Sequence, residues 1–422
     1  MNFFIYFFLS FILLSCSKKD DNLVDVQSYL KQGKSIKIFD QNNLNDSNIS
    51  KISQISIDTL FENKDWTQSN GNIQNLNLPS NIYFSKKKIS FSGKFQKIIS
   101  YKDKIFIIGD NSELIILNSS LKKLNSIKIY KKKNYKNYKI KFDLVAYDNK
   151  IYISDNLGNI TALNIESLKK IWSLKLGVPF RSNIKISNNK LYIINSNSKI
   201  YSIDAQKGKI LWSIETASKD IKDEDSYQIS IYGNKLYFTN DYSEIFCLDL
   251  IDQNIKWSLV FSKSNFQKVP KIFKSSPIVI DNNGDIFVST NYGTTYKIDS
   301  KIGYIKWSNQ IFYLNRPVIT KKYLIAIHNN RFFILNKSNG NIVFNKKISF
   351  ERKNKDLFLK NILVSKKYIY FFTSNGQVGL LNIKKLDDIK IEKKLGTSSM
   401  YKDYILSNGE LFVLTNNLII KY

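Results

Sequence analysis

The sequence predicts an all-β fold, an eight-bladed β-propeller closed by an N-terminal strand that pairs with the C-terminal blade. An apolar residue followed by Asn or Asp recurs seven times, and an aromatic slot lies eight positions after it. Short β-type segments precede each recurrence. A period of about 40 to 50 residues built from such segments is typical of propeller blades. The Asn or Asp positions are 118, 164, 204, 249, 299, 336 and 382.

The aromatic slot is expected to be structural. Its members are Trp172, Trp212, Trp257, Trp307 and Phe344, and the first and last repeats have lost the aromatic. A large aromatic at the same place in every blade buries apolar area between neighbouring blades. We therefore assign these side chains to interblade packing rather than to ligand binding.

Each repeat contains four short segments with the pattern of antiparallel strands. In the best-defined unit they span residues 183–187, 190–194, 199–204 and 209–213. β-branched and aromatic residues dominate these runs, and Asn, Ser and Gly occupy the turns between them, as in chains of β-hairpins. Four such strands make one blade.

The two ends of the chain are expected to share the eighth blade. Segments 404–406, 410–414 and 418–422 form a last triplet of strands, and the chain stops where a fourth would begin. Residues 65–67, around Trp66, are the candidate for the missing strand, so Trp66 is grouped with the repeat aromatics. Joining first and last segments in one blade removes a free sheet edge.

The N-terminal region has the pattern of an exported, lipid-anchored protein. Residues 1–15 are expected to be a signal peptide, because the apolar run 3–14 is too short to span a bilayer. The junction before Cys16 resembles a bacterial lipobox, in which the Cys becomes the acylated N-terminus. Residues 16–60 are rich in Lys, Asp, Asn and Ser and predict a flexible tether. The propeller is expected to span residues 61–422.

The formal net charge of +29 raises the question of nucleic-acid binding. The densest basic patch, residues 131–139, mixes Lys with Tyr, as grooves that bind single strands do. Lys is nevertheless spread over every repeat, and an exported protein rarely meets nucleic acid. We predict no nucleic-acid partner, and consider anionic lipid headgroups the better match for the patch.

The residues that usually carry catalysis are sparse. His328 is the single histidine, and Cys16 and Cys247 are the two cysteines. One His without neighbouring Cys ligands does not make a metal site, and no Ser/His/Asp set or Gly-rich phosphate loop is visible. We expect no enzyme activity, no cofactor and no metal, with His328 in a turn and Cys247 a buried thiol in a strand.

The repeat resembles that of pyrroloquinoline-quinone-type propellers, on the segments 203–212 and 298–307. That superfamily includes the quinoprotein dehydrogenases and the BamB family of outer-membrane assembly lipoproteins. The lipobox, the length, the insertion at 262–276 and the start at 65–72 are similar to BamB. The vicinal Cys pair that dehydrogenases place over the quinone has no counterpart in this sequence.

The resemblance to BamB implies a partner surface. BamB binds BamA, a membrane barrel with periplasmic POTRA domains, through loops on one face of the ring. Here those loops correspond to residues 216–227 and 263–276, and the alternative is two solvated loops without a partner. The residues expected to contact BamA are Ile221, Lys222, Phe266, Lys268, Ile272 and Phe273.

These observations predict a non-enzymatic scaffold lipoprotein of the outer-membrane β-barrel assembly machinery, the BAM complex. It would be anchored to the outer membrane through acylated Cys16, face the periplasm, and assist insertion of unfolded barrel proteins at BamA. The alternative is a periplasmic quinoprotein-like oxidoreductase or ligand-binding propeller.

Overall fold

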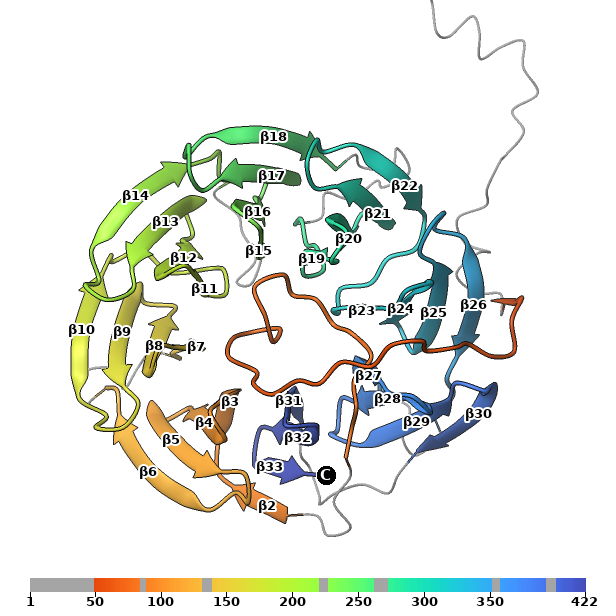
Figure 1. The fold of residues 1–422 in the computed structure, drawn as a ribbon, viewed down its shortest axis with the longest axis horizontal. Helices are drawn as coiled ribbons and strands as arrows, with labels where there is room; N and C mark the ends of the chain where they lie inside the picture. The colour runs from red at the N-terminus through yellow and green to blue at the C-terminus, as the bar shows by residue number, and fades with distance from the viewer. Residues whose placement is uncertain are drawn as a thin grey trace, which may run out of the picture. The chain divides into compact units, whose positions relative to one another are not determined.

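Eight antiparallel sheets surround a central channel in the computed structural model, which confirms the predicted eight-bladed propeller (Figure 1). The structure describes residues 49–83, 89–130, 139–219, 227–261, 272–350, 357–391 and 400–422. All of these residues belong to one unit, Ser47–Tyr422. Within these ranges no helix has the length and apolar character needed to cross a membrane.

The blades follow one another along the chain, and each begins at the channel and ends at the rim (Figure 1). Blade 1 contains β3 (Phe95–Tyr101), β4 (Lys104–Gly109), β5 (Glu113–Asn118) and β6 (Lys123–Lys128); blade 2 contains β7 (Phe142–Tyr147), β8 (Lys150–Asp155), β9 (Asn159–Asn164) and β10 (Lys170–Lys175); blade 3 contains β11 (Lys185–Ser187), β12 (Lys190–Ile194), β13 (Lys199–Asp204) and β14 (Ile210–Glu215); blade 4 contains β15 (Ile229–Tyr232), β16 (Lys235–Thr239), β17 (Glu244–Asp249) and β18 (Ile255–Val260). Blade 5 contains β19 (Val279–Ile280), β20 (Asp285–Thr290), β21 (Thr294–Asp299) and β22 (Ile305–Asn309); blade 6 contains β23 (Val318–Ile319), β24 (Tyr323–His328), β25 (Arg331–Asn336) and β26 (Ile342–Lys347), with β1 (Ile49–Ser50) added; blade 7 contains β27 (Leu359–Val364), β28 (Tyr368–Thr373), β29 (Val378–Asn382) and β30 (Lys385–Ile391); blade 8 contains β31 (Tyr401–Ser407), β32 (Glu410–Thr415), β33 (Leu418–Lys421) and β2 (Ile89–Ser92).

Burial along the strands explains their sequences. The second strand of a blade is covered on both faces by neighbouring blades, and β4 is accordingly almost continuously apolar and buried. The fourth strand lies at the rim, and β10, β14 and β18 alternate between exposed and half-buried residues. Paired Asn and Asp residues with positive φ, such as Asp148 and Asn149, form the tight hairpin turns.

The repeat aromatics pack between blades, as predicted. Trp172 lies against Gly208 of the next blade, and its Nε1 donates to the Ala205 carbonyl at 3.0 Å. Trp257 and Trp307 repeat this contact with Gly303 and Gly340. Phe344 is buried in the core shared by blades 6 and 7.

Trp212 departs from this pattern, although it also packs in an interblade core. The following blade carries Gln253 at the position where blades 3, 5 and 6 carry the contacted glycine. The Nε1 of Trp212 is buried without a hydrogen-bond partner within the described ranges. The loss of one glycine in the repeat thus coincides with the loss of the hydrogen bond that accompanies it elsewhere.

The two chain ends do share blade 8, but the predicted closing strand was wrong. Residues 89–92, which form β2, pair with β33 from Ile89–Lys421 to Ser92–Leu418 and complete the blade. Residues 65–67 lie inside the ring instead, so Trp66 is not a member of the repeat aromatics. The closing strand, β2, therefore comes later in the chain than Trp66, the residue from which its position had been predicted.

The predicted boundary between tether and ring at residue 60 is also wrong for the described residues before it. Ile49 of β1 pairs with Asn345 at the outer edge of blade 6. The Ile55 side chain is buried in the core of blades 6 and 7, and its N–H donates to the Ile383 carbonyl at 2.9 Å. Residues from 49 onward are therefore part of the propeller.

Replacing Gly208 by Ala should destabilise the ring more than replacing Gly233. Both glycines have positive φ, at +67° and +57°, so each Ala variant should lose about 1 to 2 kcal/mol through backbone strain. A Cβ on Gly208 would lie 2.5 Å from the Trp172 ring, whereas nothing lies within 4 Å of one on Gly233. Overpacking should cost Gly208→Ala a further ~1 to 3 kcal/mol in denaturant unfolding. Equal losses in the two variants would contradict the proposed Trp contact.

Two faces of β2 offer a test of ring closure. Ile89 and Phe91 pack against the core of blades 1 and 8, whereas Ser90 and Ser92 are exposed. Replacing both Ile89 and Phe91 by Asp should lower the free energy of unfolding by roughly 2 kcal/mol or more and promote aggregation through the opened edge. The control with Asp at Ser90 and Ser92 should unfold close to wild type. Indistinguishable melting curves for the two double variants would disprove closure by β2.

Candidate functional site

The centre of the ring is occupied by the chain's own residues 64–80, here called the channel segment. Figure 1 shows this part of the red-to-orange trace lying inside the circle of blades. It hydrogen-bonds to every blade in turn, mostly through the backbone of the innermost strands. The backbone contacts are Ser100 N to Trp66 O at 3.0 Å, Ala146 N to Thr67 O at 2.8 Å, Ile231 N to Ile73 O at 2.8 Å, Ile280 N to Gln74 O at 3.1 Å, Ile319 N to Asn77 O at 2.9 Å, Ser80 N to Val364 O at 2.8 Å and Asn408 N to Lys64 O at 3.2 Å.

Blade 3 contacts the channel segment through a side chain instead. Lys185 of β11 is fully buried, and its Nζ donates to the carbonyls of Ser69 and Asn72 at 2.7 and 2.8 Å. Burial lowers the pKa of Lys185 to about 7, and the opposing carboxylate of Asp143 offsets part of this shift. A neutral amine has two N–H donors, which match the two carbonyls.

A carboxylate links the channel segment to blades 1 and 3. Asp143 accepts hydrogen bonds from the hydroxyl of Ser69 and from the Ile184 N–H, the latter at 2.9 Å. Lys97 lies 3.6 Å from both Asp143 and Asp403. Burial alone would lower the pKa of Lys97, but the two carboxylates outweigh it and raise that pKa. Ser69 is 2% exposed, so its hydroxyl holds the segment in place and is not presented to a substrate.

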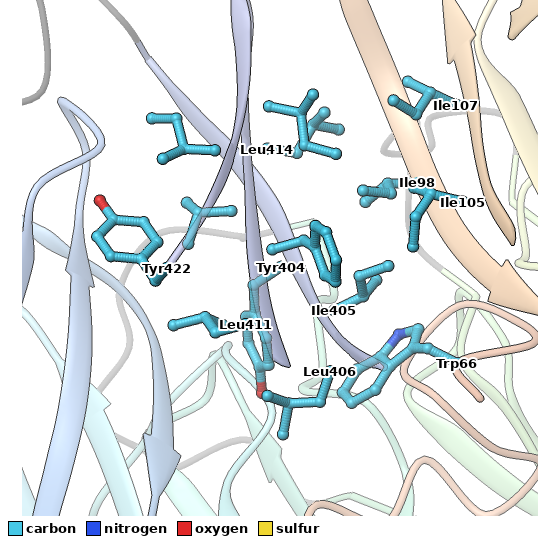
Figure 2. Close-up of a cluster of buried hydrophobic side chains, with 14 of the residues drawn as sticks. Trp66, Ile98, Ile105, Ile107, Tyr404, Ile405, Leu406, Leu411, Leu414 and Tyr422 are labelled. Carbon is cyan, nitrogen blue, oxygen red and sulfur yellow. The ribbon is translucent and has the colours of Figure 1, made fainter. Parts of the chain in front are cut away.

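The other end of the segment is held by aromatic and cationic contacts. Figure 2 shows Trp66 beside side chains of β31, including Tyr404 and Leu406. The Arg316 guanidinium lies 4.8 Å from the centroid of the Trp66 ring and donates to the Tyr404 hydroxyl at 2.9 Å. It also donates to the Asn70 carbonyl. Trp66 thus anchors the channel segment between blades 1 and 8.

Two asparagines of the segment cap backbone groups that would otherwise be unpaired. The Asn75 side-chain amide donates to the carbonyls of Ile229 and Ile278 at 2.9 and 3.0 Å. Asn77 donates to the Ile362 carbonyl at 3.4 Å and to the Tyr404 hydroxyl at 3.3 Å. A channel lined by inner-strand backbone needs such partners because buried N–H and C=O groups are costly when unsatisfied.

One face of the ring collects the long connections, and we call it the crossover face. Successive strands of a blade run antiparallel, so the fourth strand ends at the level where the next inner strand begins. The described ends of the connections between blades therefore lie at this face, including residues 93–94 between blades 8 and 1. The longer connections span residues 129–141, 176–184, 216–228, 261–278, 310–317, 348–358 and 392–400. A cavity of about 870 Å³ opens there, with Asn70 of the channel segment in its lining.

Both predicted partner loops, 216–227 and 263–276, are crossovers of adjacent blades. Ile221, Lys222, Phe266 and Lys268 lie outside the described residues, as does the lipidation candidate Cys16. Ile272 is 43% exposed on the crossover face. Phe273 is 3% exposed and packs on Phe261 and Tyr292, so the expectation of a surface anchor at Phe273 is wrong.

His328 and Cys247, the two side chains considered for catalysis, lie in surroundings that indicate a structural role. His328 ends β24 and packs against Phe312 with the rings tilted by 50° and their centroids 3.9 Å apart, and burial lowers its pKa to about 4. Cys247 is a buried free thiol in β17, as expected. Within the described ranges, no group of three or more His, Cys, Asp or Glu side chains is placed to hold a metal ion.

Sequence reasoning missed the channel segment. Residues 64–80 are rich in Asn, Gln and Ser and lack the alternation of a strand, so they resembled a loop leading into the ring. One signal was present in Lys185, which occupies an inner strand where other blades carry Val, Ser or Ile. A lysine in the most buried strand of a blade indicates nearby acceptors in the channel.

The comparisons with known proteins agree with this architecture. A family model described as outer membrane protein assembly factor BamB matches residues 141–346. BamB from Moraxella catarrhalis superposes with a TM-score of 0.63 at 13% identity, over 79% of this chain and 97% of that one. Quinohemoprotein alcohol dehydrogenase from Comamonas testosteroni gives 0.61 at 10% identity, over 85% and 80%. The WD40 domain of Sif2 gives 0.58 at 11%, over 80% and 99%.

No curated protein matches the sequence. At these identities the likeness to solved structures shows the fold alone. The family match covers blades 2 to 6, from residue 141 to residue 346, and it confirms the predicted resemblance to BamB and the PQQ-type repeat.

The buried lysine predicts a distinct pH dependence. The pKa of Lys185 is about 7 in the folded ring and about 10.4 in an unfolded chain. The unfolded state therefore binds more protons between these values, so this group makes the fold more stable as pH rises above 7. The advantage of wild type over Lys185→Met should grow by up to about 1.4 kcal/mol per pH unit. Parallel melting-temperature profiles for the two proteins between pH 7 and 9 would contradict the buried amine.

Proposed function

We propose that this eight-bladed propeller, which resembles BamB over residues 141–346, is a non-enzymatic scaffold of the outer-membrane barrel assembly machinery. In this proposal it binds the POTRA domains of BamA and helps insert unfolded barrel proteins. The observation that carries the proposal is the match of residues 141–346 to the family model described as assembly factor BamB. Retention at the periplasmic face of the outer membrane would come from acylated Cys16.

The ring itself supports a role in binding. Its channel is crossed by residues 64–80, whose polar groups bond to the blades. The described ends of the connections between blades lie at the crossover face, and the loops 216–227 and 263–276 connect adjacent blades. Ile221, Lys222, Phe266 and Lys268 remain proposed contacts, together with the exposed Ile272. Phe273 is left out because it is buried against Phe261 and Tyr292.

A quinoprotein-like oxidoreductase is the competing function, since alcohol dehydrogenases share the fold. The two are separated by adding pyrroloquinoline quinone and calcium to the purified protein. A scaffold should show neither quinone absorbance after gel filtration nor dye reduction with an alcohol. Stoichiometric quinone binding with turnover would overturn the scaffold proposal.

The membrane anchor is tested at Cys16. Cys16→Ala should abolish incorporation of labelled fatty acid and release the protein from membranes, while the melting temperature of the ring stays unchanged. A lipoprotein Cys carries two or three acyl chains, which suffice for stable anchoring. Retention of the variant on membranes washed with high salt, in cells depleted of BamA, would show that another feature holds it there.

The partner surface is tested by titrating BamA POTRA domains. The double variant Ile221→Ala with Lys222→Glu should weaken binding by well over tenfold, because a few central anchors dominate most interfaces and a reversed charge adds repulsion. Its thermal stability should remain that of wild type.

The matched control replaces Lys207 and Lys209 by Glu. These exposed lysines lie in the turn between β13 and β14, at the end of the strands opposite the crossovers. The control should bind POTRA domains almost as wild type does. Equal affinity of the loop variant and wild type would exclude the loop as a contact, whereas a loss confined to the control would place the interface on the opposite face.

A further inference from the structure

The cavity at the crossover face, here called the funnel, lies at the centre of the ring. Its volume of about 870 Å³ lies within the usual range for ligand pockets. The connections before the inner strands of several blades form its wall, and Asn70 of the channel segment contributes to its lining. The same segment bonds to all eight blades, so the wall of the funnel and the centre of the ring are joined through it.

Basic side chains outnumber acidic ones in this funnel. Its lining contains five basic side chains and three acidic ones. Asp143 is paired with Lys97 and also accepts hydrogen bonds from Ser69 and the Ile184 N–H. Asp155 keeps its charge but accepts the Tyr130 hydroxyl and the N–H groups of Leu157 and Asn159, the last two at 2.8 and 3.0 Å. The lining therefore has an excess of positive charge.

The basic groups are not balanced in the same way. Lys97 is paired with Asp143 and Asp403, but Arg181, Lys139 and Lys402 have no carboxylate within 4 Å in the described part of the chain. Arg181 is the most constrained of the three. Its backbone N–H donates to the Ile194 carbonyl at 3.0 Å, and its half-buried side chain has an Nε without any hydrogen-bond partner among the described residues. A half-buried guanidinium without a carboxylate partner favours the binding of an anion.

We propose that this funnel binds an extended acidic peptide, with Arg181 as the principal anchor for a carboxylate. The guanidinium fork matches a carboxylate in two parallel hydrogen bonds, and Lys139 and Lys402 add positive charge around it. Pro179, Phe180 and Leu314 in the wall offer apolar contact for the peptide backbone and for side chains between the acids. A small inorganic anion would pair with the cationic side chains but would not make these apolar contacts.

The test uses the purified full-length protein in detergent and a fluorescein-labelled peptide, (Glu-Ala)4, followed by fluorescence anisotropy. The peptides (Gln-Ala)4 and (Lys-Ala)4 report whether the carboxylates are required. Wild type should bind (Glu-Ala)4 and neither of the others. Arg181→Gln should weaken this binding about tenfold or more, because it removes a charge-assisted bidentate contact. Lys402→Gln should weaken it by a smaller factor.

The matched control is Lys209→Gln, which removes one positive charge from an exposed site on the opposite face. It should leave the affinity within about twofold of wild type, because separations beyond a Debye length are screened at physiological salt. Arg181→Lys keeps the charge without the fork and should give an intermediate loss, which covers the case that Arg181→Gln does not fold.

Three outcomes would overturn the proposal. Equal weakening by Arg181→Gln and Lys209→Gln would mean that the net charge of the ring attracts the peptide without a site. Equal binding of (Glu-Ala)4 and (Gln-Ala)4 would remove the carboxylate requirement. Displacement of the peptide by pyrophosphate at concentrations below the peptide's own Kd would identify the funnel as a site for a phosphate anion.

Discussion

The pairing of one extended segment with the inner strands of all eight blades is the contact on which this propeller depends. Seven blades bond to residues 64–80 through backbone groups and blade 3 does so through the Lys185 side chain, in sequence around the ring. Because the same segment leads into β2 through residue 83, the ring is connected at its centre and at its seam by one stretch of chain. The eight blades therefore share a common partner in addition to their neighbours.

Packing between blades is the second interaction that determines how neighbouring blades are arranged. The Trp of one blade lies on the Gly turn of the next, and its indole N–H donates to a carbonyl of the same turn. This contact fixes the distance between adjacent rims, while the β-branched inner strands fix the distance between adjacent cores. Its weakest case is Trp212, where Gln253 replaces the glycine and the indole N–H has no hydrogen-bond partner within the described ranges. The repeat tolerates this loss because large apolar surfaces around Trp212 remain buried.

The functional surfaces follow from the connectivity of the blades. Antiparallel strands place the ends of the interblade connections at one face, where the charged funnel also opens; loops 216–227 and 263–276 are two of these connections. The side chains that hold the channel segment, Lys185 and Arg316, donate hydrogen bonds to the chain's own carbonyls. The proposed binding surfaces of the ring therefore lie at its crossover face.

The number of blades, their strands and the interblade role of the aromatics were predictable from the sequence alone. These features depend on local patterns that repeat, and on the area that a Trp or Phe buries whatever its exact partner. The path of residues 49–83 and the identity of the closing strand were decided by the tertiary structure. Those residues do not belong to any repeat. Their Asn and Gln side-chain amides can form hydrogen bonds with the exposed backbone of any strand. Only the closed ring brings together the eight inner strands, Lys185 and Arg316 that select one path through the channel. The burial of Phe273 was likewise decided by packing, since Phe261 and Tyr292 lie 12 and 19 residues from it along the chain.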